Sequence, residues 1–201
     1  MTPQFFAALA AFVAVTSWTP GPNNLMLVAS GVNFGFSRTV PHMLGIAIGF
    51  PLMIVIIGLG MGQLFAAFPQ LYDILKWLSV VYMIWLAWKI ATAGPLNKET
   101  AAAAQPMRFH EAVMFQWVNP KAWAMALAGI ASHTIPSAFA TSLTLLAVTF
   151  GIITFPGVAV WTIFGVGLRR LLQDPARVQI FYIARAVLLL ASLYPVLAGW
   201  E

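Results

Sequence analysis

The residues best suited to bind a small polar molecule lie in two short stretches that interrupt apolar sequence. One stretch is residues 17–24, inside an apolar run over residues 4–32, and the other is residues 119–121, inside a run over residues 112–132. Proline lacks a backbone donor, so each stretch frees carbonyl groups in a helix. Inside a membrane such groups need partners within the protein or in a water-filled cavity. Two facing breaks would hold an amino group and a carboxylate through helix ends and neutral amides.

The two breaks supply the predicted substrate-binding residues, which are Pro20, Gly21, Pro22, Asn23, Asn24, Asn119, Pro120 and Lys121. A lysine well inside an apolar run needs a partner, so Lys121 would bind a carboxylate or exchange partners during transport. The alternative is that the prolines kink two helices for packing alone, with the amides satisfied locally and Lys121 capping carbonyls or reaching the membrane surface. Arg185, two turns into the last apolar run, carries the same two interpretations.

Residue patterns typical of catalysis and metal binding are missing from the sequence. It has no cysteine, and its few acids, Asp73 and Glu111 among them, lie near the ends of apolar runs or in polar segments. It contains no HExxH, phosphate-binding loop or GxSxG motif, and no activated nucleophile stands out. We therefore expect no enzyme activity, no metal and no cofactor. His42 and His110, near the ends of apolar runs, are minor candidates for handling a proton.

The composition predicts an integral membrane protein. Of 201 residues, 61% are hydrophobic and 7% are charged, and the mean hydropathy is +0.89. Soluble domains carry roughly a quarter of their residues as charged side chains. The net charge of +5 comes from ten lysines and arginines scattered singly, without the basic stripe of a nucleic-acid-binding protein. We expect a lipid bilayer around this chain and no nucleic-acid partner.

The hydropathy pattern predicts an all-α membrane protein with six transmembrane helices in a single domain over residues 1–201. The expected spans are residues 4–32, 41–68, 71–91, 112–132, 138–168 and 178–200. Two halves, about 1–92 and 110–201, would be joined by a cytoplasmic loop over about 93–109. Most basic residues then fall on one side of the membrane, which predicts both termini on the opposite, periplasmic side. Because the first residues lack a basic signal region, the first span is expected to stay in the mature protein.

The two halves resemble each other. The two breaks occupy the first and fourth spans, and Phe50-Pro51 in the second span matches Phe155-Pro156 in the fifth. Three spans per half would place the second half upside down, as an inverted repeat with its broken helices at the repeat interface. Pro51 and Pro156 are then expected to be flex points. Glycine pairs at four-residue spacing favour close helix packing, within one chain or in a homodimer.

Four motifs together resemble the LysE/RhtB family of amino-acid exporters. They are Thr19-Pro20-Gly21-Pro22-Asn23-Asn24, Gly35-Phe36-Ser37-Arg38, Tyr82-Met83-Ile84-Trp85-Leu86-Ala87-Trp88-Lys89 and Asn119-Pro120-Lys121-Ala122. The resemblance covers the whole chain. It implies a bacterial inner-membrane secondary transporter with about six spans, driven by the proton gradient, that exports a small amino acid or derivative. Residues 22–24 and 85–92 are most similar to the subgroup that exports cysteine and O-acetylserine.

The sequence departs from this family's pattern at two places. Phe50-Pro51 stands where many members carry a polar or acidic residue, and residues 128–136 lack the usual aromatic run. The coupling ion and the substrate therefore stay open. Two other functions also stay open: a passive channel or pore, and a membrane subunit that transports nothing.

Overall fold

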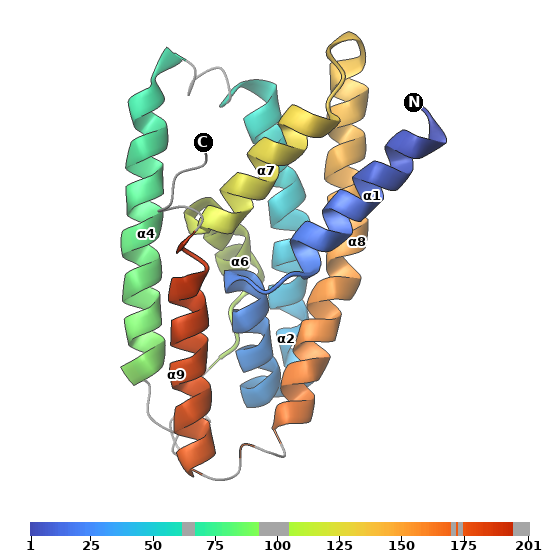
Figure 1. Ribbon diagram of the computed structural model, residues 1–201. Coiled ribbons are helices and arrows are strands. Elements are labelled where there is room, and N and C mark those ends of the chain that lie inside the picture. The colour runs from blue at the N-terminus through green and yellow to red at the C-terminus, as the bar shows by residue number, and fades with distance from the viewer. Residues whose placement is uncertain (62–66, 93–104, 170–171, 173–174, 195–201) are drawn as a thin grey trace.

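The computed structural model describes residues 1–61, 67–92, 105–169, 172 and 175–194, and these residues form helices joined by short connections (Figure 1). The long helices are α1 (Pro3–Trp18), α2 (Pro22–Ile56), α4 (Pro69–Thr92), α8 (Phe139–Leu168) and α9 (Pro175–Ala191). The shorter ones are α6 (Phe109–Phe115), α7 (Pro120–His133), a π-helical turn η1 (Ile57–Met61) and two 3₁₀ turns, η2 (Gln116–Val118) and η3 (Pro136–Ala138). Most of the expected loop over residues 93–109, and the end of the chain after residue 194, lie outside the described residues.

The helix labelled α2 consists of two segments that reverse direction at Gly35. Gly35 has φ 79° and ψ 177°, and the helix is regular on either side of it. The Ser30 and Thr39 hydroxyls lie 2.8 Å apart, whereas nine residues of continuous helix would separate their backbones by roughly 13 Å. The sequence predicts an irregular connection over residues 33–39. The structure instead turns at one glycine, and the Thr39 hydroxyl closes the turn by donating to the Gly35 carbonyl at 2.7 Å.

The chain leaves helical geometry at both predicted breaks. The first helix ends at Trp18, Thr19 and Gly21 are extended, and α2 then begins at Pro22. A proline suits this first position because its missing N–H would have no helical partner there. In the second break the 3₁₀ turn η2 ends at Val118, and the next residue, Asn119, is extended and caps α7.

The core of the molecule lies where α2 packs along α8. Gly165 of α8 faces Val28, and Gly31 faces Thr162, so closely that a Cβ on either glycine would collide with a backbone carbonyl oxygen. Gly45 and Gly49 allow the same close approach to α6. These glycines therefore pack helices within one chain, and a homodimer stays a prediction.

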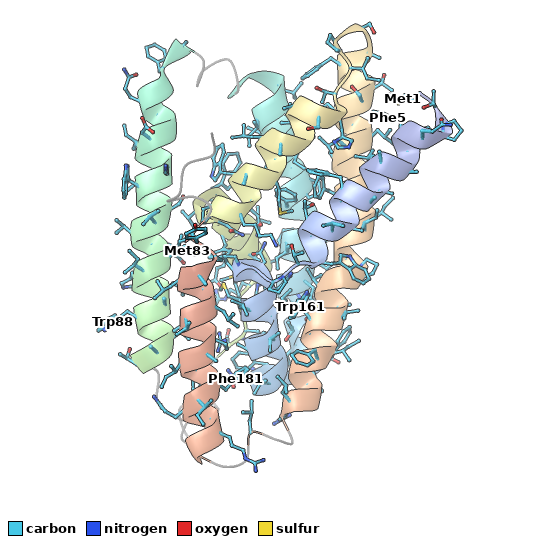
Figure 2. The ribbon with its side chains drawn as sticks, viewed as in Figure 1. Met1, Phe5, Met83, Trp88, Trp161 and Phe181 are labelled. Atoms are coloured by element: carbon cyan, nitrogen blue, oxygen red, sulfur yellow. The ribbon has the colours of Figure 1, made fainter. Side chains whose placement is uncertain are left out.

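Polar side chains lie inside the bundle and apolar ones cover much of its outside. Thr39, His42, Gln116 and Asn119 are buried. Exposed apolar side chains follow α4, where Trp88 is 64% exposed and points away from the other helices (Figure 2). This distribution suits a lipid environment, because lipid tails take no hydrogen bonds from the protein.

Two helical stretches are long and apolar enough to cross a membrane, namely Pro22–Gly60, with its reversal at Gly35, and Pro136–Leu168. The second segment of α2 together with η1 spans about 25 residues, or roughly 37 Å of helix. The all-helical architecture is thus established for the described residues. The full six-span count, the inverted repeat, the single-domain organisation and the position of the termini stay predictions.

Replacing Gly35 tests the reversal. A Cβ at Gly35 would meet no atom within 4 Å, so a Gly35→Ala change acts through backbone strain alone. We expect it to lower the free energy of unfolding by about 1–3 kcal/mol, because φ 79° with ψ 177° is a backbone region that essentially only glycine occupies. The measurement is denaturant-induced unfolding in detergent micelles. Gly167→Ala, at another open position but inside α8, is the control and is expected to be neutral or stabilising. Equal loss in both variants would contradict the strain argument.

Candidate functional site

The two helix breaks face each other, and Lys121 joins them. Lys121 follows Pro120 in the first turn of α7, and its ammonium Nζ donates across to the first break. It lies 2.8 Å from the Thr19 carbonyl, 2.8 Å from the Thr19 hydroxyl and 3.3 Å from the Pro20 carbonyl. The interruption of the helix leaves the Thr19 and Pro20 carbonyls without the backbone donors of residues 23 and 24, and they receive a charged donor from the other half of the chain.

A reciprocal amide pair forms the second bridge between the breaks. Asn23 Nδ2 donates to Gln116 Oε1 at 2.8 Å, and Gln116 Nε2 donates back to Asn23 Oδ1 at 3.3 Å. Gln116 is fully buried, and its Nε2 also donates to the Ala112 carbonyl at 2.8 Å. This pairing satisfies two neutral polar groups without introducing a charge.

The other two asparagines act within their own breaks. Asn24 Nδ2 donates to the carbonyls of Ser17 at 3.1 Å and Thr19 at 2.8 Å, so it stabilises the end of α1. Asn119 Oδ1 accepts from the Lys121 backbone N–H at 3.2 Å and caps α7. The local interpretation therefore holds for Asn24 and Asn119, whereas Asn23 and Lys121 connect the two breaks.

Two tryptophans attach the first break to α8. Trp18 Nε1 donates to the Ile153 carbonyl at 3.0 Å, three residues before Pro156, and its ring covers Gly157. In return, Trp161 Nε1 donates to the Trp18 carbonyl at 3.0 Å. Trp161 lies beside the connection from α1 to α2 (Figure 2). The end of α1 is thus held to α8 on both sides of Pro156.

A small cavity lies between the breaks. Its polar lining combines Asn23, Asn24, Asn119, Lys121 and Gln116 with Thr16, Ser17 and Thr154, and its apolar lining includes Ile46, Phe50, Met125 and Val158. The space open to the centre of a water molecule is about 30 Å³. Because one buried water needs roughly 10–15 Å³ by this measure, the cavity has room for a few waters at most. A molecule the size of an amino acid requires the breaks to move apart.

The structure brings six of the eight predicted substrate-binding residues to this cavity, and their role in binding stays a prediction. Gly21, Pro22, Asn23, Asn24, Asn119 and Lys121 line it, whereas Pro20 and Pro120 shape the breaks beside it. The helices continue through Pro51 and Pro156, so their role as flex points stays a prediction.

The sequence analysis missed Gln116 and Thr19 as site residues. A signal for Gln116 was present, because an uncharged amide in an apolar span needs a partner inside the protein. Thr19 contributes its carbonyl, which any residue carries, so its type gives no such signal.

A double-mutant cycle on Asn23 and Gln116 tests the bridge between the breaks. Asn23→Leu leaves the buried Gln116 amide, and Gln116→Leu the partly buried Asn23 amide, without this partner, and each is expected to destabilise the protein by about 1–2 kcal/mol. The double variant is expected to lose less than the sum, with a coupling energy of about 0.5–2 kcal/mol. Unfolding in detergent micelles measures all four proteins. Gln116→Leu combined with Thr144→Ala, an exposed position on α8, is the control and should be additive; additivity of the Asn23 pair would contradict the bridge.

The chain is similar to proteins of known function over most of its length. Several curated relatives are 29% identical over 179 residues, which cover 88% of this chain and 90% of theirs. They include the cysteine/O-acetylserine efflux proteins of Escherichia coli strain K12 and of Shigella sonnei strain Ss046. No solved structure matches the chain. The model of the LysE type translocator family matches residues 14–192, a range that contains both breaks and the cavity between them, and the chain therefore belongs to the LysE type translocator family.

Proposed function

We propose that this protein exports a small amino acid or amino-acid derivative across the bacterial inner membrane and binds it between the two helix breaks. The observation that carries the proposal is the contact of the Lys121 ammonium with the carbonyls of Thr19 and Pro20. Family membership and the efflux function named for the relatives support it. Cysteine and O-acetylserine, which those names print, are the first substrates to test.

An amino-acid zwitterion carries the two groups that this contact joins. Its ammonium group would take the place of Lys121 Nζ at the freed carbonyls of the first break. Its carboxylate would pair with the displaced Lys121 ammonium, and the N-terminal ends of α2 and α7 favour negative charge at the same place. Binding would therefore exchange one set of charge-assisted hydrogen bonds for another, without leaving a buried charge unpaired.

Transport in this proposal separates the two halves alternately on either side of the site. The halves are inverted repeats of three spans each, both termini are periplasmic, and the second and fifth spans bend at Pro51 and Pro156. The proton gradient drives export. Asn23 and Gln116 close the site when it is empty, because their amides satisfy each other across the breaks.

Counterflow in proteoliposomes tests the function. Vesicles preloaded with unlabelled cysteine, O-acetylserine or another amino acid are diluted into a trace of the labelled compound, with and without a pH gradient. A carrier is expected to accumulate label transiently, to saturate, and to respond to the gradient. Flux that does not saturate would indicate a pore, and no flux for any amino acid would indicate a subunit that transports nothing.

Lys121 is the most direct residue to test. We expect Lys121→Met to abolish counterflow at normal protein abundance, because the carbonyls of the first break lose their charged donor and the substrate carboxylate loses its partner. Lys76→Met in α4 is the control and should transport like the unaltered protein. Full transport by Lys121→Met would remove Lys121 from the proposal.

The prolines of the first break allow a second test. Pro20→Ala combined with Pro22→Ala restores two backbone donors and favours a helix through residues 19–21, which would remove the carbonyls from the site. We expect counterflow to fall at least about tenfold, the effect of losing roughly 1.4 kcal/mol of binding, while the protein still inserts in the membrane. Pro3→Ala, which alters the first residue of α1 instead, is the control. Unchanged transport in the double variant would show that the break is not needed.

A further inference from the structure

A second polar cavity lies away from the two breaks, where α2, α4 and α9 meet. Its volume is about 170 Å³ by the same measure that gives about 30 Å³ for the cavity between the breaks. Its polar lining is Arg185, His42, Asn33 and Ser30, surrounded by apolar residues such as Leu86 and Met107. No acid is among the described residues that line it. Among the described residues, the lining therefore combines a positive charge and room for a small molecule with no carboxylate.

Arg185 enters this cavity without a hydrogen-bonding partner for Nε. The side chain is 7% exposed, and within the described part of the chain Nε is buried and donates to nothing. The guanidinium group lies over the rings of Phe181 and Tyr182, at 5.4 and 5.7 Å from their centroids. Phe181 comes from the same helix, one turn earlier (Figure 2). The ring contacts orient the guanidinium and leave its planar set of donors available for an oxyanion.

His42 is a second buried group on the same cavity without a hydrogen-bonding partner, and Glu111, outside the lining, acts on it electrostatically. It lies in the second segment of α2, is 2% exposed, and neither ring nitrogen has a hydrogen bond among the described residues. Buried polar atoms are nearly always satisfied in proteins, so an unsatisfied pair of nitrogens facing a cavity indicates a missing ligand or water. The Ser30 hydroxyl, by contrast, already pairs with Thr39.

We propose that this cavity is a binding site for a single oxyanion, held by Arg185 and positioned by His42 and Asn33. The chemistry is shared by two sources, the carboxylate of a small amino acid and the phosphate of a lipid headgroup. A guanidinium binds either oxyanion through parallel N–H donors. The site is separate from the pocket at Lys121, because Asn33 lies ten residues beyond Asn23, or roughly 15 Å along a helix.

The site predicts an unusual effect of removing Arg185. If the guanidinium only supported the fold, replacing it would lower the stability of the protein. A buried charge that pairs only with a bound ligand instead destabilises the ligand-free protein. We therefore expect Arg185→Met to leave the Tm of the ligand-free protein unchanged or to raise it, and at the same time to abolish oxyanion binding. Arg177→Gln, an exposed arginine two turns earlier on α9, is the control for both measurements.

Two binding experiments on the purified full chain in neutral detergent distinguish the sources. In the first, calorimetry compares L-serine with L-serinamide, which lacks the carboxylate, and it uses the Lys121→Met background so that the pocket between the breaks does not contribute. In the second, native mass spectrometry compares dioctanoyl phosphatidylglycerol with dioctanoylglycerol, which lacks the phosphate. We expect one oxyanion probe to bind, its neutral analogue not to bind, and Arg185→Met to weaken binding at least tenfold.

The outcomes separate this proposal from the exporter proposal. Selective, Arg185-dependent binding of either probe supports the site, whatever the transport assays give. The site is overturned if Arg185→Met changes the affinity for both probes by less than twofold, or if it lowers the Tm without affecting binding. Should Arg185→Met fail to fold, Asn33→Leu supplies the test, because it fills the cavity from the surface of α2 and is expected to block the same binding.

Discussion

The structure depends on one constraint: backbone carbonyls exposed by the first break must be satisfied inside an apolar bundle. A continuous helix would supply the N–H groups of Asn23 and Asn24 to the Thr19 and Pro20 carbonyls, but the chain leaves helical geometry between Trp18 and Pro22. Lys121 provides a charged donor from the opposite break, and the carbonyls provide hydrogen-bond acceptors for its partly buried ammonium group. Each break therefore supplies hydrogen-bonding partners for the other.

This mutual dependence explains the arrangement of the surrounding helices. The close contacts at Gly31 and Gly165 bring α2 against α8, and those at Gly45 and Gly49 bring it against α6. These contacts place the ends of α1 and α7 within hydrogen-bonding distance of each other. Because the chain reverses at Gly35, the first segment of α2 packs against α8 through Gly31, and the second segment packs against α6 through Gly45 and Gly49. Small residues thus set the positions of the polar ones.

Much of the fold and about half of the site follow from the sequence by physical rules. Proline, glycine and asparagine in apolar runs locate the breaks, because their backbone effects are local. The pairing of Asn23 with Gln116 does not follow, since it depends on how two distant helices are rotated. The contact of Lys121 with Thr19 likewise uses a carbonyl, which every residue carries. The sharpness of the turn at Gly35 was not predicted either. The hydropathy pattern indicates a seven-residue connection over residues 33–39, whereas one glycine with positive φ is enough to reverse the chain.

The two tryptophan hydrogen bonds determine which parts of the molecule can move as one body. Because Trp18 and Trp161 each donate to the other helix's backbone, the end of α1 cannot separate from α8 without losing both bonds. The contacts between the breaks are of another kind, one flexible ammonium and one amide pair, and a polar solute can replace both. Widening the site would therefore break the polar contacts between the breaks first. It would leave α1, α7 and α8 joined by the apolar core that Val13, Ala126 and Leu146 share.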